Sequence, residues 1–231
     1  MGLDIRLEQV AHEYGRDAAS ARVQALDHVD LHISAGDFIV LMGESGSGKS
    51  TLLNLMGAVD RPTRGRIWLG QTEISTLSEG GLTALRRTEI GFVFQFFNLI
   101  PTLTVRENVG FPLALAGVPA GQSKARTDEA IAAVSLTPRA DHFPNELSGG
   151  EMQRVAIGRA IVHRPPIILA DEPTGNLDSR TGDVILNLLH AVHESYNPTI
   201  VMATHSEHAA GFGQYVVEVR DGAVTRRSSA G

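Results

Sequence analysis

The sequence predicts an α/β fold with a mixed sheet, an antiparallel β part and an inserted all-helical part. Short apolar runs at 38–42 and 167–170 stop abruptly at glycine or acidic residues, as buried strands of a parallel sheet do. Alternating apolar and polar residues near the N-terminus predict half-buried antiparallel strands. The segment 104–136 has a helical pattern without any strand signal, so we expect a separate helical lobe there.

Composition limits the possible functions. The 231 residues are enough to bury a sizeable core, and we expect one domain with two lobes. The net charge of −6, from 20 basic and 26 acidic residues, offers no global attraction to DNA, although a local basic patch stays possible. The absence of cysteine excludes disulfides, zinc knuckles and thiol chemistry. We expect neither a signal peptide nor a membrane-spanning segment, so any membrane role must come through a partner.

The antiparallel strands are expected at 3–7 and 29–33, where Leu, Ile and Val alternate with polar residues. Between them, residues 14–21 predict an exposed turn. Tyr14 is the only aromatic residue before Phe38, and its flat ring could stack on adenine if a nucleotide binds nearby. An ordinary turn tyrosine is the alternative, and the residue type alone favours neither.

A glycine-rich loop follows the strand at 38–42. The stretch GESGSGKST fits the phosphate-loop pattern G-x-x-x-x-G-K-[ST], and its glycines allow successive N–H groups to turn around a phosphate. Lys49 offers a charge to the β- and γ-phosphates, Ser50 offers a hydroxyl to Mg²⁺, and a helix at 50–56 points its positive end at the anion. A plain turn is the alternative, but the complete context favours nucleotide binding. The candidate nucleotide-binding residues here are Gly43, Ser45, Gly46, Ser47, Gly48, Lys49, Ser50 and Thr51.

The next segment predicts a turn at 61–65, a short strand at 67–69, a helix at 82–87 and a strand at 90–94. Gln95 ends that strand, where its amide can reach a metal ion or a water. The apolar residues of FFNLIP, 96–101, form either lobe core or a docking surface, and both interpretations stay open.

The helical lobe is expected at 96–164, inserted between nucleotide-binding segments 1–95 and 165–231. Within it, Asn108, Pro112 and Gly117 are expected to interrupt the helices, and Pro138 and Pro144 lie in the return path.

A second glycine motif, LSGGE, precedes a helix expected at 152–163. Ser148 can cap this helix, while Gly149 and Gly150 leave N–H groups open to an anion near Glu151. Since one nucleotide needs only the cradle of its own loop, one interpretation is that this second site serves a nucleotide bound to another copy of the chain. A simple helix cap is the alternative.

Two adjacent carboxylates follow the apolar strand at 167–170. Carboxylates at the end of a buried strand are costly unless they are used or paired. Asp171 is placed to organise Mg²⁺ and its water shell, and Glu172 to activate the attacking water. A solvated pair of charges is the alternative.

The last third of the chain predicts the loop GNLD, 175–178, a helix at 179–194 and a strand at 199–204. His205 ends this strand, where an imidazole can donate to a γ-phosphate, and the other histidines are expected at the surface. A closing hairpin is expected at 215–224, followed by a frayed tail at 226–231.

Taken in order, these motifs resemble the nucleotide-binding subunit of ATP-binding cassette (ABC) transporters over essentially the whole chain. GESGSGKST is similar to the Walker A loop, IILADE to the Walker B strand and LSGGE to the ABC signature. The remaining matches are Gln95 (Q-loop), GNLD with Asp178 (D-loop), His205 (switch histidine) and Tyr14 (adenine-stacking aromatic). Walker A alone leaves many phosphate-loop families open, whereas LSGGE in its place is specific. The departures Glu44, for a frequent proline, and Gly158, for a frequent alanine, touch no assigned role.

The resemblance implies a P-loop ABC ATPase that works as a head-to-tail pair, with ATP between the Walker A loop of one copy and LSGGE of the other. ATP binding would close the pair and hydrolysis would open it. The loop at Gln95 would pass this motion to a transmembrane permease, which would hold the protein at the cytoplasmic face of the membrane. The implied catalytic residues are Lys49, Gln95, Glu172 and His205, and the implied Mg²⁺ ligands are Ser50, Gln95 and Asp171.

The segments FVFQFFNLIPTLTVRENV and VDRPTRG are similar to the subgroup that serves lipoprotein release and the export of macrolides or antimicrobial peptides. Two other hypotheses stay open. One is a soluble ABC ATPase that acts on DNA or ribosomes, although no nucleic-acid partner is expected here. The other is a regulatory subunit that resembles the cell-division type and transports nothing.

Overall fold

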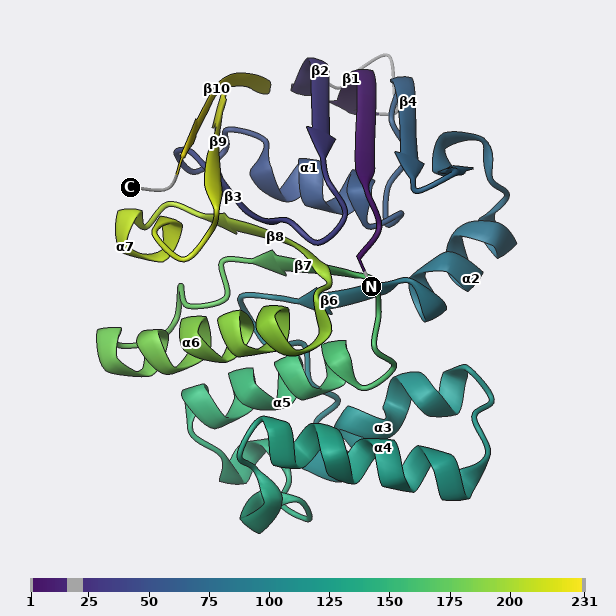
Figure 1. Ribbon diagram of the computed structural model, residues 1–231, viewed down its shortest axis with the longest axis vertical. Helices are drawn as coiled ribbons and strands as arrows, with labels where there is room; N and C mark the ends of the chain where they lie inside the picture. Colours follow the sequence, from purple (N-terminus) through teal and green to yellow (C-terminus); the bar gives the residue numbers. More distant parts are fainter. Residues whose placement is uncertain (1, 16–22, 230–231) are drawn as a thin grey trace.

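Two β-sheets frame the part of the chain that the structure describes (Figure 1). The computed structural model describes residues 2–15 and 23–229. An antiparallel sheet has the order β2-β1-β4-β5, and a six-stranded mixed sheet has the order β10-β9-β3-β8-β7-β6. The strands are β1 (Ile5–Tyr14), β2 (Val23–Ile33), β3 (Phe38–Met42), β4 (Arg64–Leu69), β5 (Thr72–Glu73), β6 (Ile90–Val93), β7 (Ile167–Asp171), β8 (Thr199–Thr204), β9 (Tyr215–Arg220) and β10 (Ala223–Ser229).

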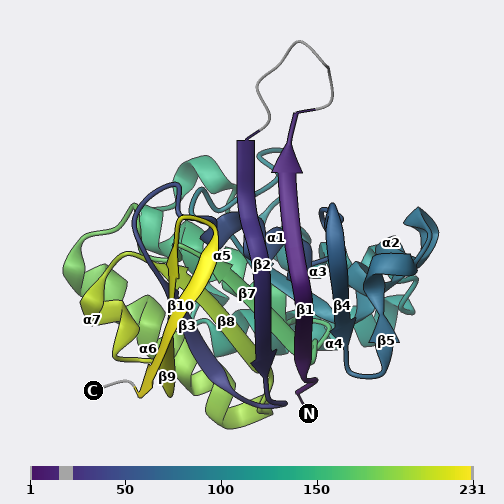
Figure 2. The ribbon, with the colours of Figure 1, turned by 90° about the horizontal axis from the view of Figure 1, so that it is seen from above.

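Helices separate and cover these sheets. Figure 1 shows α1 between the two sheets, α6 and α5 on the other side of the mixed sheet, and α3 and α4 at the far end. The helices are α1 (Lys49–Met56), α2 (Glu79–Thr88), α3 (Val105–Leu115), α4 (Ala120–Ala133), α5 (Gly149–Ile161), α6 (Ser179–Tyr196) and α7 (Glu207–Ala210), with short 3₁₀ turns at Ile74–Thr76, Thr137–Arg139 and Pro144–Glu146. Seen from above, β1, β2 and β4 run side by side, and the β9–β10 hairpin lies next to β2 (Figure 2). None of the helices in the described ranges is long and apolar enough to cross a bilayer.

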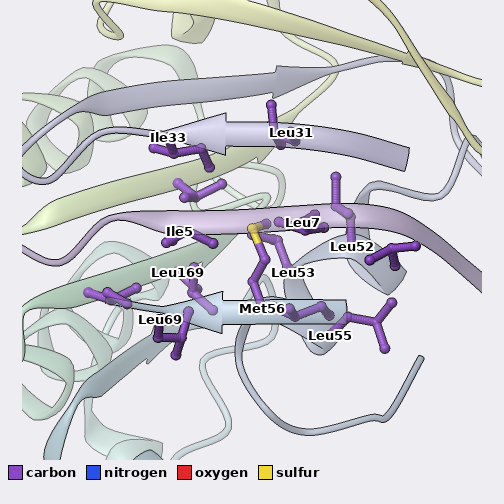
Figure 3. Close-up of a cluster of buried hydrophobic side chains, with 14 of the residues drawn as sticks. Ile5, Leu7, Leu31, Ile33, Leu52, Leu53, Leu55, Met56, Leu69 and Leu169 are labelled. Carbon is purple, nitrogen blue, oxygen red and sulfur yellow. The ribbon is translucent and has the colours of Figure 1, made fainter. Parts of the chain in front are cut away.

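The central strands are buried on both faces, which explains their uninterrupted apolar sequences. In β3, Ile39 and Leu41 face one core, while Phe38 and Val40 face the other. The first core fills the space between the sheets, where side chains of α1 pack against β1, β2 and β4 (Figure 3). The second core joins the opposite face of the sheet to α3, α4, α5 and α6. Both faces of the mixed sheet are therefore apolar, and the polar residues lie at its edges.

Parallel pairing brings the carboxyl ends of three strands to one edge. Met42 at the end of β3 pairs with Thr204 at the end of β8, and Ala203 of β8 pairs with Asp171 of β7. The glycine-rich loop, the two carboxylates and His205 leave the sheet immediately after these positions. This register, rather than any feature of a single segment, assembles the candidate site.

The predicted architecture is confirmed: a mixed sheet, an antiparallel sheet and a helical part coexist in the order expected. The strands predicted at 38–42 and 199–204 have those bounds in the structure. The helix expected from Met152 begins earlier, at Gly149, because Ser148 is its N-cap. The strand expected at 67–69 begins at Arg64, so the predicted turn ends sooner than residue 65.

Two predicted interruptions of the helical lobe are wrong. Asn108 lies inside α3 and is fully buried, because its side chain is satisfied by the preceding turn. Its amide donates to the carbonyls of Ile100 and Leu103 at 3.0 and 2.9 Å, and its oxygen accepts from the Ile100 N–H at 2.8 Å. Pro112 also lies within α3, which continues to Leu115. Only Gly117, in the connection to α4, matches the prediction.

Three further expectations need correction. Tyr14 is the last residue of β1 rather than part of a turn, and residues 16–21 of that expected turn lie outside the described ranges. Residues 226–229 do not fray, because they pair with β9 as an antiparallel edge strand, whereas 230–231 are outside the description. Finally, not every other histidine is at the surface, since His12 is only 8% exposed.

Candidate active site

A cavity of about 480 Å³ opens at the carboxyl edge of the mixed sheet. One end is formed by the facing ends of β1 and β2, and the other end by residues that follow β6, β7 and β8. The glycine-rich loop forms the floor between them. The lining residues are Tyr14, Val23, Gln24, Ala25, Ser45, Gly46, Gly48, Lys49, Ser50, Thr51, Gln95, Asp171, Glu172 and His205.

The loop needs glycine for two different physical reasons. At Gly43 a Cβ atom would lie 2.2 Å from the carbonyl oxygen of Val219, so the loop can pass β9 only without a side chain. Gly48 has φ 107° and caps α1 in the left-handed region, which only glycine adopts readily. No side chain caps this helix and no acidic residue lies in its first turn, so its N-terminus is left for an anion.

Lys49 lies across the loop with its charge inside the cradle. Its side chain is buried, and Nζ donates to the carbonyl oxygens of Gly43 and Glu44 at 2.7 and 2.9 Å. Ser47 is placed differently from its neighbours, because its hydroxyl is buried, does not line the cavity and has no partner among the described residues. Its N–H donates to the Glu44 carbonyl at 3.2 Å. Of the predicted loop residues, Gly43 and Ser47 therefore support the loop from behind.

Ser50 and Asp171 meet although they are far apart in sequence. The Ser50 hydroxyl donates to Oδ1 of Asp171 at 3.1 Å. Burial raises the pKa of Asp171; the Ser50 hydrogen bond opposes this rise, Glu172 adds to it, and Lys49 lowers it. Because burial disfavours the ionised form of this carboxylate, a cation that binds beside it would stabilise that form. In the described ranges no three His, Cys, Asp or Glu side chains cluster to hold a metal ion.

Glu172 and His205 form a hydrogen-bonded pair at the same end of the cavity. Nδ1 of His205 lies 3.0 Å from Oε1 of Glu172, whose side chain is 15% exposed against 68% for the histidine. Glu172 has φ 45°, an unusual backbone conformation for a residue other than glycine. At Gly175 a Cβ would lie 2.9 Å from the Gln95 amide nitrogen, so this glycine lets the loop after β7 pack against Gln95.

Gln95 is held in place by a residue that the sequence did not single out. Its amide lies 3.4 Å from Oδ1 of Asn176, and the Asn176 amide donates to the backbone carbonyl of Gln95 at 3.0 Å. Asn176 belongs to the GNLD loop, so the predicted Q-loop and D-loop are joined within one copy of the chain.

Tyr14 forms the opposite end of the cavity. Its ring is 42% exposed, and its hydroxyl lies 3.3 Å from Oγ1 of Thr51, in the first turn of α1. Tyr14, the phosphate loop and the Glu172–His205 pair all line the same cavity. The arrangement suits an elongated ligand with an aromatic group at one end and a charged group at the other.

The second glycine motif lies outside this cavity. Ser148 caps α5, accepting from the Glu151 N–H at 3.3 Å, while Glu151 Oε2 accepts from the Ser148 N–H at 2.8 Å. These Ser148 contacts, with a smaller contribution from Arg139, lower the pKa of Glu151. Gly149 and Gly150 form the first turn, where helix geometry leaves their N–H groups without an intrahelical acceptor.

Asp178 also lies outside the cavity that holds the phosphate loop. It caps α6, and its Oδ1 accepts from the N–H groups of Arg180 and Thr181 at 3.1 Å each. The hydroxyl of Thr181 donates to the same carboxylate and is the main cause of its lowered pKa. Like Ser148, Gly149, Gly150 and Glu151, this residue faces no phosphate loop within its own chain.

Residues 23–25 line the cavity but carried no signal in the sequence. They reach the site because Val23 pairs with Tyr14 across the β1–β2 ladder. The ladder is irregular near this end, with register shifts between Val10 and Glu13. Apolar alternation alone does not predict such shifts.

Comparison with known proteins places the chain in a family. Residues 26–175 match the family described as ABC transporter. The uncharacterized ABC transporter ATP-binding protein MJ0796 of Methanocaldococcus jannaschii is 45% identical over 226 residues, covering 96% of this chain and 95% of that protein. The macrolide export ATP-binding/permease protein MacB of Brucella melitensis is 44% identical over 220 residues, covering 95% of this chain but 34% of MacB.

Solved structures agree with these matches. Two structures of MJ0796 superpose with a TM-score of 0.90 at 42% identity, covering 98% of this chain and 99% of that chain. One is a dimeric post-hydrolysis state of the ATP-binding cassette bound to ADP and Pi, and the other is a dimeric ABC transporter cassette. Similarity of this extent covers the fold, the phosphate loop and the strand-end carboxylates together. The chain therefore belongs to the ABC transporter family and is a cassette that binds and hydrolyses ATP.

Proposed function

We propose that this cassette is the ATP-driven subunit of a membrane complex that exports a substrate or moves a mechanically coupled machine of the cell envelope. Two copies would close around two ATP molecules and act on a transmembrane permease from the cytoplasmic face of the membrane. One observation carries the paired arrangement: the phosphate loop and the LSGGE helix start are both suited to anions, yet only the first lines the cavity. The relative MJ0796, solved as a dimer, and MacB, named as an ATP-binding/permease protein, support the proposal.

Within the cavity, different groups of the chain would contact different parts of the nucleotide. Tyr14 offers a ring face to the adenine, and the loop residues that line the cavity, which are Ser45, Gly46 and the segment 48–51, surround the phosphates. Lys49 releases its contacts with Gly43 and Glu44 to bind the β- and γ-phosphates.

The donor set beside Asp171 fits Mg²⁺. A hydroxyl from Ser50, a carboxylate from Asp171 and the amide oxygen of Gln95 are hard oxygen ligands at the same end of the cavity. When bound, Mg²⁺ neutralises phosphate charge and makes the terminal phosphate a better electrophile. Ser50 and Asp171 would hold the cation, and its charge would favour the ionised form of Asp171, which burial disfavours.

Hydrolysis needs a group that accepts the proton of the attacking water. Glu172 is mostly shielded from solvent, and its carboxylate is oriented by the hydrogen bond from His205. We assign Glu172 as the general base and His205 as the group that orients it through Nδ1 and, when the imidazole carries a proton on each nitrogen, donates to the γ-phosphate through Nε2. Gln95, which Asn176 holds, completes this end of the site.

The second copy would supply the residues that find no phosphate within their own chain. Ser148, Gly149, Gly150 and Glu151 lie at the start of a 13-residue helix, and Asp178 lies at the start of α6. We propose that residues 96–164 form the helical subdomain that carries this helix start to the nucleotide of the other copy. The cap at Ser148 keeps the helix end ordered before that contact forms.

The membrane partner has a suitable surface. No residue of the segment 96–101 is buried, and Phe96 is 72% exposed, which favours a docking surface over lobe core. A groove of about 390 Å³ lies beside it between α2, β6, α3 and α5, and apolar residues such as Phe94 and Leu115 line it together with arginines. Arg159 ties this groove to the Q-loop, donating to the carbonyl oxygen of Phe97 at 2.7 Å.

The test is a mild-detergent pull-down with tagged Glu172→Gln protein and ATP, with Lys49→Ala protein as the control, at an ATP concentration too low to saturate its weakened site. We expect Glu172→Gln to lower kcat by about 10² to 10⁴ and to trap an ATP-dependent pair. Recovery of a polytopic membrane protein with Glu172→Gln supports the proposal. Recovery of ribosomes or nucleic acid alone overturns it and favours a soluble ABC ATPase instead.

A further inference from the structure

A buried histidine lies behind the ring that the proposed function places against adenine. We propose that His12 is a positioning residue, which holds Tyr14 in its nucleotide-binding orientation and affects affinity only through Tyr14. This inference rests on the proposed function, because it requires Tyr14 to contact the base. No motif of the family resemblance includes His12.

The contact between the two rings is direct. Their centroids are 4.6 Å apart and their planes meet at 80°, an edge-to-face arrangement that aromatic groups favour. His12 and Tyr14 are two residues apart on β1, and the ring contact shows that their side chains meet although the β1–β2 register is irregular here. The hydroxyl of Tyr14 is near Thr51, so the phenol is held at its tip by α1 and at its ring by His12.

His12 can act as a fixed support because its own ring is anchored. Nδ1 lies 2.9 Å from the carbonyl oxygen of Arg61, and since a carbonyl can only accept, Nδ1 carries the proton and donates. The loop that supplies this carbonyl is itself bound to β1 on both sides of His12. The Thr63 N–H donates to the Ala11 carbonyl at 2.9 Å, and the Glu13 N–H donates to the Thr63 hydroxyl at 3.0 Å.

The burial of His12 shows that it does not contact the ligand itself. Its side chain is among the buried polar groups, and it does not line the cavity, whereas Tyr14 is 42% exposed there. Nε2 is buried without a hydrogen-bond partner in the described ranges. A polar ring in this position costs free energy of desolvation, which an apolar side chain would avoid. Its benefit is the combination of an anchor at Nδ1 with a flat edge against Tyr14.

A tyrosine without this support would have to be ordered when ATP binds. Immobilising one such side chain reduces affinity several-fold. The loss should concern only the base, because the hydrogen bond of His12 goes to Arg61 and its ring contact goes to Tyr14, and neither residue belongs to the phosphate loop. We therefore expect His12 variants to weaken ATP binding and to leave the binding of a phosphate chain without a base unchanged.

The experiment compares ATP with inorganic tripolyphosphate by calorimetry in EDTA, which prevents turnover. We expect Tyr14→Ala to weaken ATP binding about tenfold and His12→Ala about fivefold, with tripolyphosphate binding unchanged in both. In the Tyr14→Ala background, His12→Ala should have no further effect. This loss of additivity separates a positioning role from general damage to the strand.

Two conservative variants distinguish the ring from its anchor. His12→Phe keeps an aromatic ring against Tyr14 but loses the anchor to Arg61, and its affinity for ATP should lie between those of the unmodified chain and His12→Ala. His12→Gln keeps a donor for the Arg61 carbonyl, preserves the fold if alanine does not, and should weaken ATP binding as His12→Ala does. The matched control is His193→Gln, since His193 also bonds a backbone carbonyl, that of Gly36, and lies beside an aromatic ring, Phe38, but is remote from the cavity.

The outcomes separate this inference from the proposed function. If Tyr14→Ala weakens ATP binding and His12→Ala does not, the role of His12 is wrong and the adenine contact stands. If His12→Ala weakens tripolyphosphate binding equally, or still acts in the Tyr14→Ala background, the positioning role is also wrong. If Tyr14→Ala leaves ATP affinity unchanged, the adenine contact fails and the inference fails with it.

Discussion

The phosphate loop and the LSGGE motif each place glycine at the start of a helix, and these two helix starts differ in how their N-terminal groups are satisfied. α1 begins at Gly48 with no side-chain cap and no acidic residue in its first turn, and it forms the floor of the cavity. α5 begins at Ser148 with a complete capping box, closed by Glu151, and it lies outside that cavity. Both helix starts therefore contain glycine, but only α5 has a side-chain cap and only α1 lines the cavity.

This difference shows how each helix N-terminus is stabilised before an anion binds. At α1, Nζ of Lys49 donates to two carbonyl oxygens of the loop until a phosphate becomes its partner instead. At α5, Ser148 and Glu151 stabilise the helix end within the chain, so it can stay folded with no ligand. The N-terminus of α1 therefore depends on a bound anion to offset its partial positive charge, whereas the N-terminus of α5 is capped by side chains of its own chain. The following predictions test that contrast.

The largest effect is expected at the first helix start. Lys49→Ala removes the only lysine or arginine that lines the described cavity, so the affinity for ATP should fall about 100-fold. Isothermal titration calorimetry measures this change. Lys124→Ala is the control, because Lys124 is an exposed residue paired with Asp128 in the helical part, and it should leave the affinity unchanged. Equal affinity in Lys49→Ala and the unmodified chain would remove the phosphate-loop assignment.

An intermediate effect is expected at the second helix start. Ser148→Ala loses the N-cap, which should reduce the free energy of unfolding by about 1 kcal/mol in urea denaturation. In the Glu172→Gln background it should also raise the ATP concentration needed for pairing, while the ATP affinity of one copy stays constant.

Thr104→Ala supplies the matched control for Ser148→Ala. Thr104 caps α3 with the same capping box, closed by Glu107, but it belongs to no proposed anion site. It should cost a similar free energy of unfolding and leave ATP-dependent pairing unaffected in size-exclusion chromatography. If both variants impair pairing equally, LSGGE is only a helix cap, and the contrast between the two helix starts disappears.

The smallest effect is a pH dependence at Glu151. Hydrogen bonds from Ser148 lower its folded pKa below the ordinary 4.5, so its stabilisation is present above that value and is lost as pH falls through the folded pKa. Between about pH 5 and pH 3, the unmodified chain should lose on the order of 0.5 kcal/mol more stability than Glu151→Gln. Urea denaturation across this range measures the difference. A difference between the two proteins that does not change with pH would show that Glu151 contributes no charged cap.

Local features were predicted well where a segment's own sequence determines its structure. The runs 38–42 and 199–204 are strands with those bounds, because both of their faces are buried and no polar residue interrupts them. The phosphate loop was predicted because glycine, lysine and serine are each required at fixed positions. The polar strand at 226–229 was predicted as a frayed tail, since an edge strand paired on one side needs little apolar sequence.

Asn108 shows why polar residues mislead local prediction. Its amide typically marks a turn, yet here it is buried inside α3, because the carbonyls of the preceding loop satisfy it. The residues next to Asn108 in the sequence do not indicate that these carbonyls lie beside its side chain.

The sequence by itself determined the chemistry of this protein: a phosphate loop, two carboxylates after a buried strand, and a histidine after another. Only the tertiary structure decided that Ser50 meets Asp171, that Glu172 pairs with His205, and that residues 23–25 join the cavity. It also placed His12 beneath Tyr14. The reason is physical: periodicity and turn chemistry act over a few residues, whereas strand register is set by burial between segments far apart in the chain.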